Sequence, residues 1–189
     1  GNKFKHDLDN QLPEFIAEVT GVQRFVPNVV MEGGALEVNG AGVLLTTRQC
    51  LLEKHRNPDL SAADLERSLS DYLGVQKILW LEDGMENDHT DGHIDTISRF
   101  ASERVIVTCV CEDETDPNFV VLQRNLELLR TFTDLEGKPF EIVTLPLPAH
   151  RLEVHGRRLP PTYANFYIGN GCVIVPTYDD VNDSRALEI

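Results

Sequence analysis

The sequence predicts a mixed α/β or α+β fold in a single domain that spans residues 1–189. Short apolar runs that suit strands alternate with amphipathic segments that suit helices, and the order strand, helix, strand occurs twice. With 41% hydrophobic residues, a chain of 189 residues is long enough to form one ordinary core. The two strand–helix–strand segments share little sequence identity with each other, so the repeat is inferred from the order of their elements.

The first unit begins with a predicted strand over residues 43–47. A helix follows over residues 62–73, with Ser61 as its N-cap, an acid three residues later, and Gly74 as its stop. Residues 76–81 are the next predicted strand, and they end shortly before an acidic segment. Functional residues often lie on loops that follow strands, which makes that segment the first place to search for a site.

The second unit repeats this order. Residues 105–110 are a predicted strand, and the next helix begins at Asp116, carries apolar side chains as far as Phe132 and ends at Gly137. Residues 140–145 are the closing strand. The order of elements therefore matches that of the first unit.

A hairpin is predicted after the second unit. Its arms are residues 163–168 and 172–175, and Asn170 and Gly171 form the turn between them.

The four cysteines do not suggest a disulfide framework. Cys109 and Cys111 lie in the apolar run of residues 105–111 and Cys172 precedes another apolar run, so we expect all three to be small buried hydrophobic side chains. Cys50 lies at the predicted start of a helix. No second cysteine pair has zinc-site spacing, and a reduced, cytoplasmic protein is the expectation.

The charge restricts the possible partners. The formal net charge of -14 at pH 7 disfavours nucleic acid, which needs clustered Lys and Arg, and favours cationic partners. No run of about 18 apolar residues occurs, so we expect no membrane span. Residues 1–7 are polar and lack the apolar region of a signal peptide.

The acidic segment at residues 88–95 carries the chemistry-bearing side chains. If it is extended, Asp91, His93 and Asp95 point to one face, because side chains alternate along a strand. An imidazole between two carboxylates can transfer protons while its neighbours hold a cation. Two alternatives remain open: a metal hydrolase that also uses His89, with zinc or manganese as the metal, and a solvated acidic loop without a site.

Several short motifs occur in a fixed order, and the ordered set is more specific than any single motif. They are residues 31–34, 51–58, 80–81, 88–95, 99–100, 145–148 and 163–171. Together they resemble the agmatine deiminases, within the bacterial-type peptidylarginine deiminase family of guanidine-modifying (pentein) enzymes. The resemblance covers nearly the whole chain.

The resemblance implies a pentein-type α/β propeller of five ββαβ modules around a central site, of which this chain forms a part. It also implies a cysteine thiolate that attacks the guanidinium carbon, so that ammonia leaves and a covalent intermediate forms. A histidine protonates the leaving nitrogen and then activates the water that completes hydrolysis. No metal or other cofactor is expected.

Individual roles follow from the same resemblance. His93 would be the general acid/base, while Glu32 and Asp95 would be the carboxylates that contact the guanidinium. Asp88 and Asp91 would support or orient His93.

Two family segments have no counterpart in residues 1–189: Trp-x-Arg-Asp-x-Gly-Pro, and a glycine-rich segment that ends in His-Cys. The nucleophile would therefore lie outside this chain, and none of its four cysteines is expected to replace it. The chain alone would be an inactive central fragment. Glu37 and Asn39 stand where the family usually has His and Asp, which leaves the role of that loop open.

The favoured reaction is conversion of agmatine to N-carbamoylputrescine and ammonia, a step of putrescine and polyamine biosynthesis. The alternatives are a peptidylarginine deiminase, a non-catalytic fragment and a metal-dependent hydrolase. Among substrates, free arginine ranks third, after agmatine and peptidyl-arginine. The expected partner is a small cationic guanidine, without nucleic acid or membrane. A homo-oligomer is compatible with the family.

Overall fold

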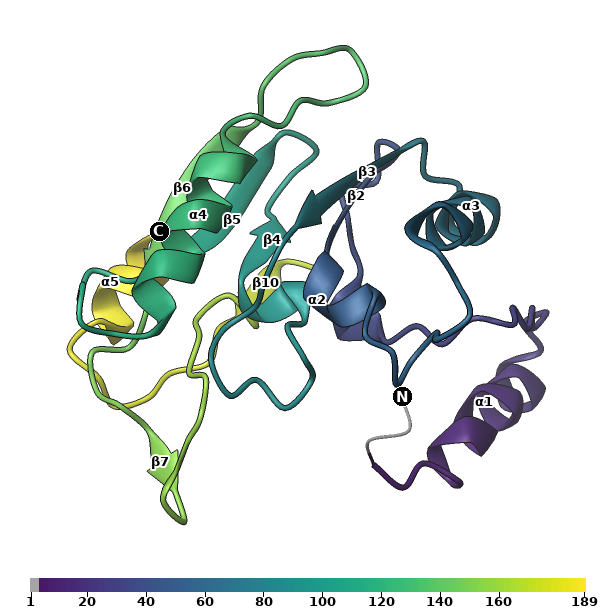
Figure 1. Cartoon of the computed structure of the whole chain (residues 1–189), viewed down its shortest axis with the longest axis horizontal. Coiled ribbons are helices and arrows are strands. Elements are labelled where there is room, and N and C mark those ends of the chain that lie inside the picture. Colours follow the sequence, from purple (N-terminus) through teal and green to yellow (C-terminus); the bar gives the residue numbers. More distant parts are fainter. Residues whose placement is uncertain (1–3) are drawn as a thin grey trace.

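The computed structural model describes residues 4–189 and contains two three-stranded sheets of the same topology (Figure 1). In the first sheet, β1 (Glu37–Val38) pairs antiparallel with β2 (Val43–Thr47), and β2 pairs parallel with β3 (Lys77–Leu81). Helix α3 (Ala62–Leu73) provides the crossover that parallel neighbours require. The first unit is therefore a ββαβ module.

The second sheet repeats this arrangement. Strand β4 (Ser98–Phe100) pairs antiparallel with β5 (Val105–Val110), and β5 pairs parallel with β6 (Glu141–Pro146). Helix α4 (Asn118–Leu129) connects β5 to β6. The mixed α/β fold and the repeated unit that the sequence predicts are confirmed at this level.

Local signals explain where α3 begins and ends. The backbone N–H of Ser61 donates to Asp64 at 3.0 Å, and the backbone N–H of Asp64 donates to the Ser61 hydroxyl at 3.3 Å. This reciprocal capping box satisfies two N–H groups that a helix start leaves without partners. Gly74, at φ 68°, ends the helix in the left-handed region that glycine tolerates.

The predicted end of the second helix is wrong. Helix α4 ends at Leu129, eight positions before Gly137. The intervening chain forms its own turn, in which Thr133 pairs with Pro139 and Asp134 accepts backbone hydrogen bonds. Gly137, at φ 79°, belongs to that turn. The helix begins at Asn118, two positions after the predicted start, and Pro117 is its N-cap; the Asp116 carboxylate still accepts the backbone N–H of Asn118 at 2.8 Å.

Two hydrophobic clusters hold the modules together. One lies between α3 and the first sheet, and the other joins the opposite face of that sheet to the second sheet and α4. The fully buried side chains of the first cluster are Leu44, Cys50, Leu51 and Leu65, and those of the second include Leu45, Leu81, Ile94, Ile97, Ile106, Leu122 and Leu129. The second cluster places the loop after β3 against both sheets.

Polar contacts across the two modules involve Glu37 and Asn39, the two positions whose role the sequence left open. The Glu37 carboxylate in β1 accepts Arg99 Nε at 2.7 Å and the backbone N–H of Phe100 at 2.9 Å, both in β4. Asn39 Nδ2 donates to the carbonyl of Glu103 at 2.9 Å. Both side chains are buried, so these positions join one module to the next.

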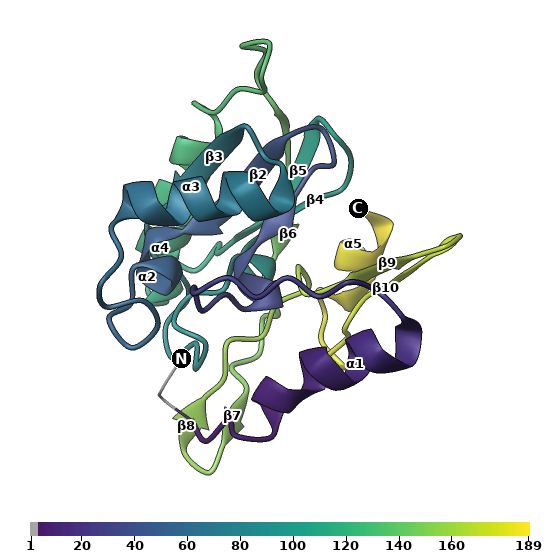
Figure 2. The ribbon, with the colours of Figure 1, turned by 90° about the vertical axis from the view of Figure 1, so that its right-hand side faces the viewer.

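Several further elements lie outside the two sheets (Figure 2). They are α1 (Leu12–Thr20), the hairpin of β7 (Glu153–Val154) and β8 (Arg157–Arg158), the hairpin of β9 (Tyr167–Gly169) and β10 (Cys172–Ile174), and α5 (Asp183–Glu188). The β9–β10 hairpin turns at Gly171, at φ 82°, as predicted, but its first arm begins at Tyr167 and not at residue 163. Cys172 is exposed, which corrects the expectation that it is buried. Within residues 4–189, no helix is long and apolar enough to cross a membrane.

Candidate active site

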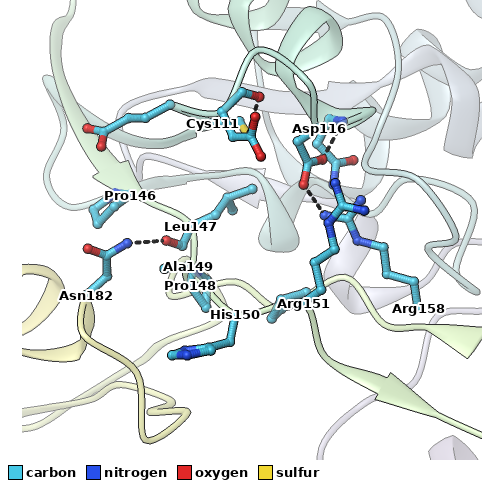
Figure 3. A pocket seen from close by; sticks show the side chains of 14 residues that line it. Cys111, Asp116, Pro146, Leu147, Pro148, Ala149, His150, Arg151, Arg158 and Asn182 are labelled. Carbon is cyan, nitrogen blue, oxygen red and sulfur yellow. Dashed lines mark hydrogen bonds and ion pairs between the residues drawn. The ribbon is translucent and has the colours of Figure 1, made fainter.

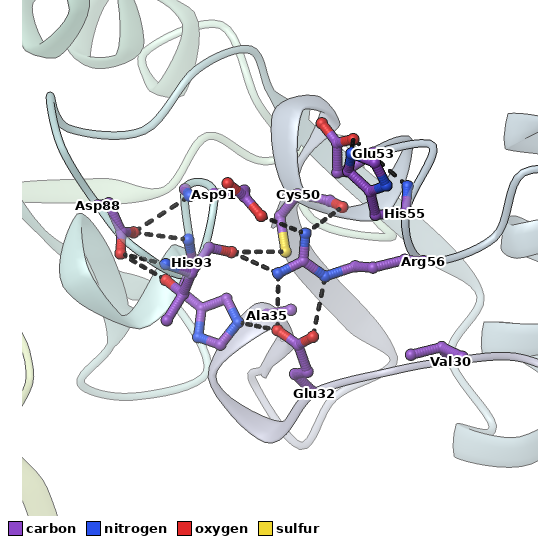
Figure 4. A network of polar contacts seen from close by, with 12 residues as sticks. Val30, Glu32, Ala35, Cys50, Glu53, His55, Arg56, Asp88, Asp91 and His93 are labelled. Atoms are coloured by element: carbon purple, nitrogen blue, oxygen red, sulfur yellow. Dashed lines mark hydrogen bonds and ion pairs between the residues drawn. The ribbon is translucent and has the colours of Figure 1, made fainter. Parts of the chain in front are cut away.

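Three loop segments meet beside the first sheet and bring most of the predicted site residues together (Figure 4). Glu32 directly precedes a 3-10 turn (Gly33–Ala35), and Arg56 follows the short helix α2 (Arg48–Leu51). The third segment, residues 88–95, follows β3 and enters a second 3-10 turn (Ile94–Thr96). Each segment adjoins an element of the first module, so the module's packing determines how the three approach one another.

The acidic segment is not a strand, and the alternation argument for it is wrong. Asp91 adopts φ 64° and Gly92 adopts φ 88°, so the chain reverses where a strand would continue. Asp91 therefore points toward Arg56, whereas His93 points toward Glu32. The proximity of His93 and Asp95 results from the following 3-10 turn instead.

Asp88 stabilises the reversal. Its buried carboxylate accepts the backbone N–H groups of Thr90 at 2.9 Å and of Gly92 and His93 at 3.1 Å each. Such local hydrogen bonds offer the backbone an alternative to a strand ladder. Asp88 thus fixes the backbone that carries His93, which is compatible with the supporting role expected for it.

His93 lies between two carboxylates. Its Nε2 is 2.5 Å from Glu32 Oε2, and its Nδ1 is 4.0 Å from Asp95 Oδ1. Gly34 makes this approach possible, because an added Cβ there would lie 2.5 Å from His93 Nδ1 and 2.6 Å from Asp95 Oδ2. The imidazole and the Asp95 carboxylate therefore pack directly on the glycine backbone.

Glu32 also pairs with Arg56, through Arg56 Nε to Oε1 at 3.0 Å and Nη2 to Oε2 at 2.9 Å. Partial burial raises the pKa of Glu32, but hydrogen bonds that include those from Arg56 and His93 outweigh burial and lower it to about 2. Glu32 is a carboxylate at neutral pH and acts as an acceptor for both partners.

Asp95 has the opposite electrostatic character. Burial raises its pKa above the usual range, and the positive charges that His93, when protonated, and Arg99 carry nearby, together with a hydrogen bond from Asn165, oppose that shift only in part. Its Oδ1 atom is buried and has no hydrogen-bond partner among the described residues. A buried acceptor without a donor is uncommon, and it is a suitable place for a donor from a bound cation.

Sequence reasoning missed three residues that surround these acids. Arg56 pairs with Glu32, Asn165 contacts Asp95, and Arg99 donates to Glu37 and stacks 5.0 Å from the ring centre of Phe166. Each lies in a motif that carries the family resemblance. That membership was the available signal, although it gave no role.

The predicted metal set of His89, Asp91, His93 and Asp95 does not form. Among residues 4–189, the group of three potential ligand atoms that lie within 4.8 Å of one another consists of Glu32, Cys50 and His93. Arg56 already pairs with that glutamate, and burial raises the pKa of Cys50 to about 12. A second cation there would meet the guanidinium and a neutral thiol.

One pocket lies beside predicted site residues, and a second lies away from them. One of about 220 Å³ adjoins Glu32 and Arg56 and is also lined by His55, His89 and Asp91. A second pocket, at the end of the second sheet, is shown in Figure 3. There Arg158 donates to Asp116, and none of the predicted site residues lines it.

Residues 1–189 match the Porphyromonas-type peptidyl-arginine deiminase family, so the chain belongs to that family. Its relatives include the agmatine deiminase of Pseudomonas syringae pv. tomato (strain ATCC BAA-871 / DC3000), which is 36% identical over 97% of this chain and 55% of the relative. The chain spans about half the length of the curated relatives it matches, for example 51% of a Legionella pneumophila protein that is 38% identical.

Solved structures show the same relationship. The agmatine deiminase of C. jejuni with substrate bound is 37% identical and superposes with a TM-score of 0.90, over 99% of this chain and 55% of that one. The agmatine deiminase of Enterococcus faecalis is 34% identical with a TM-score of 0.93, over 98% of this chain and 55% of that one.

Proposed function

We propose that this chain supplies the acid/base and substrate-orienting part of a guanidine hydrolase, with agmatine as the favoured substrate. The observation that carries the proposal is the buried Asp95 oxygen without a hydrogen-bond partner, next to His93. A guanidinium is planar and permanently charged, and it offers N–H donors along its edges that a carboxylate accepts in pairs. The agmatine deiminases among the relatives support the same substrate class.

The proton on His93 is assigned by its hydrogen bonds. An ionised Glu32 can only accept, so Nε2 carries the proton in the neutral imidazole. This leaves Nδ1, on the side of Asp95, as the nitrogen that exchanges protons with a bound guanidinium or with water. In the proposed reaction His93 first takes up a proton on Nδ1, and this imidazolium protonates the leaving nitrogen, which departs as ammonia; the neutral imidazole then removes a proton from the water that hydrolyses the intermediate.

The two predicted substrate carboxylates have unequal parts in this proposal. Asp95 contacts the guanidinium directly and fixes its orientation. Glu32 lies at the same site and contributes its negative charge, but Arg56 and His93 already engage both of its oxygens. Asp91 acts through Arg56, whose Nη1 atom donates a hydrogen bond to the Asp91 carboxylate at 3.1 Å.

The nucleophilic cysteine lies outside residues 1–189 in this proposal. Burial raises the pKa of Cys50 to about 12 and that of Cys109 to about 11, and it raises the pKa of Cys111. A raised pKa disfavours the thiolate that attacks. Cys172 is exposed on the β9–β10 hairpin, in none of the three segments that form the site.

The wider architecture is part of the same proposal. The two ββαβ modules would form part of the five-module propeller, with the site facing its centre. All four cysteines are free thiols, which suits a cytoplasmic protein. Assembly of several copies is compatible with the family.

The test is a turnover assay on protein expressed from the reading frame that contains these residues. It is expected to release ammonia and N-carbamoylputrescine from agmatine without added metal, and His93→Ala should reduce turnover by about 10²–10⁴-fold. His89→Ala is the matched control and should retain most of the activity. Activity that a chelator abolishes and zinc restores, or wild-type turnover by His93→Ala, would overturn the proposal.

A second candidate is deimination of arginine within peptides, which the name of the matched family favours. Both substrates present the same guanidinium, so the site described above serves either. Competition between agmatine and a capped arginine peptide in the same assay separates them by kcat/KM.

A further inference from the structure

We propose that Arg56 is a positioning residue, which holds the Glu32 carboxylate and the loop of residues 88–93 together and so orients His93. The inference rests on the proposed function in one respect, that His93 is the acid/base group. It assigns a task to a side chain that binds no substrate in the proposed reaction.

The geometry of Arg56 uses its whole guanidinium. Besides the two bonds to Glu32, Nη1 donates to Asp91 at 3.1 Å and to the carbonyl of Cys50 at 3.5 Å, and Nη2 donates to the carbonyl of Thr90 at 2.5 Å. All three nitrogens therefore have acceptors, and the side chain is only 5% exposed. Figure 4 shows the guanidinium between the two loops.

These contacts connect segments that are far apart in the sequence. Glu32 is 24 residues from Arg56, and Asp91 is 35 residues from it in the other direction. His93 belongs to the same loop as Asp91 and bonds Glu32 from the other side. Arg56 thus closes a ring of contacts in which the imidazole is held at both its backbone and its Nε2 atom.

The charge of Arg56 also helps to keep the Glu32 carboxyl group ionised, so that it accepts hydrogen bonds from both of its partners. Burial alone would favour the protonated carboxyl group, and Arg56 is the first of the hydrogen-bonded partners that reverse this. Two acids, Glu32 and Asp91, share one guanidinium, while Cys50 remains a neutral thiol beside them. Loss of the guanidinium would leave two partly buried carboxylates facing each other.

Lysine cannot reproduce this arrangement. An ammonium group supplies charge from a single point, whereas the planar fork of arginine binds Glu32 in a bidentate manner and reaches the loop carbonyls at the same time. Charge and orientation can therefore be separated experimentally with Arg56→Lys and Arg56→Gln.

The experiment is NMR spectroscopy of the protein without substrate, with ¹³C-labelled Glu carboxyl groups and ¹⁵N-labelled His rings. In the wild type, Glu32 should show no titration between pH 7 and pH 4. The neutral form of the His93 ring should occur as one tautomer, with the proton on Nε2. Arg56→Gln should bring the Glu32 titration into that range and give a mixture of tautomers. Arg56→Lys should keep the Glu32 titration low but still mix the tautomers.

Arg67→Gln is the matched control, because Arg67 pairs with Asp64 on the exposed face of α3 and should leave both signals unchanged. In the turnover assay, Arg56→Lys should lower kcat by about 10²-fold, as expected for a displaced catalytic group, with KM within a few-fold of wild type. If Arg56→Gln does not fold, Arg56→Lys and its His93 tautomer decide the question.

A folded Arg56→Lys protein with the wild-type His93 tautomer and kcat would overturn the inference. Arg56 would then only stabilise the fold and would not orient His93. The NMR measurements use no guanidine substrate. Absence of agmatine turnover in the wild type would therefore count against the proposed function, whereas unchanged ring signals would count against Arg56.

Discussion

At the scale of single residues, two acids on opposite sides of one imidazole have pKa values displaced in opposite directions. Glu32 is held as a carboxylate by its donors, while burial raises the pKa of Asp95. Environments that separate the pKa values of neighbouring groups are typical of catalytic sites. The sequence identified both acids but could not reveal this difference, because it depends on Arg56 and on burial.

The first prediction is that Asp95→Asn stabilises the fold while it abolishes guanidine binding. The raised pKa means that the folded protein binds a proton on Asp95 more readily than the unfolded chain does. Wild-type stability therefore increases as the pH falls from the raised value toward 3.8, the ordinary value, and is lowest above that interval. At pH 7 the amide should increase the free energy of unfolding by roughly 0.5–2 kcal/mol.

Urea denaturation of both proteins at pH 7 and pH 5 measures this effect. The gain should be smaller at pH 5, and Asp71→Asn, at an exposed position of α3, is the control. Glu32 has the opposite sign: its lowered pKa contributes stability above 4.5 that is lost as the pH falls toward 2, so pH 5 avoids that interval. A less stable Asp95→Asn protein at pH 7 would show that the carboxylate is satisfied after all.

The second prediction uses two adjacent glycines that the sequence cannot tell apart. A Cβ at Gly34 would collide with His93 and Asp95, whereas a Cβ at Gly33 meets nothing within 4 Å. Gly34→Ala should therefore displace both side chains and lower turnover by about 10²-fold or more. Gly33→Ala should remain within a few-fold of wild type in the same assay, and equal losses in both variants would refute this reading.

At the scale of elements, prediction succeeded where apolar periodicity and capping residues agree. The cores of β2, β3, β5 and β6 and both ends of α3 follow from such local signals. Prediction failed where the hydrogen bonds of one side chain redirect the backbone. The Asp88 carboxylate stabilises the chain reversal in residues 88–93, and the Asp134 carboxylate stabilises the turn after α4. The family resemblance implied a supporting role for Asp88 without predicting the chain reversal, and the sequence pattern assigned no role to Asp134.

The third prediction concerns Asp88, and the chain offers a matched control. Asp88 Oδ1 accepts the N–H and hydroxyl of Thr90, and Asp113 Oδ1 accepts those of Thr115 in the same geometry. Only Asp88 is buried and bonds two further N–H groups. Asp88→Ala should cost about 1–3 kcal/mol of stability, because it leaves buried donors without acceptors.

Asp113→Ala should cost less than about 1 kcal/mol, because its turn is exposed and water can replace the carboxylate. Thermal denaturation of both variants gives the comparison, and the His93 ring signals report whether the loop has moved. Equal losses in both variants would mean that Asp88 contributes nothing beyond an ordinary surface turn.

At the scale of the whole molecule, the repeat is a property of topology rather than of sequence identity. Both sheets have the same strand order and pairing, although their letters differ. The sequence predicted the repeated order of elements, and the family resemblance named the module. The site could be predicted only in part: the motifs contain Glu32, His93 and Asp95, but their meeting depends on segments about 60 residues apart.

The last prediction is that Glu37 and Arg99 couple the two modules energetically. Arg99 donates to Glu37 across the module boundary and to the carbonyl of Phe166, and both charged side chains are largely buried. Removing one partner of a buried pair leaves the other charge uncompensated, so Glu37→Ala and Arg99→Ala should each destabilise by about 3–5 kcal/mol. The double variant should lose clearly less than the sum, because the second substitution removes a charge that the first had isolated.

Denaturant unfolding of all four proteins completes the cycle, and Arg48→Ala with Glu82→Ala, an exposed pair at 3.3 Å, is the control cycle. If the pair matters for the whole molecule, hydrogen exchange in Glu37→Ala should show β1 and β4 opening before β5 and β6. Additive losses, or exchange that accelerates uniformly over both sheets, would show that the apolar cluster alone joins the modules.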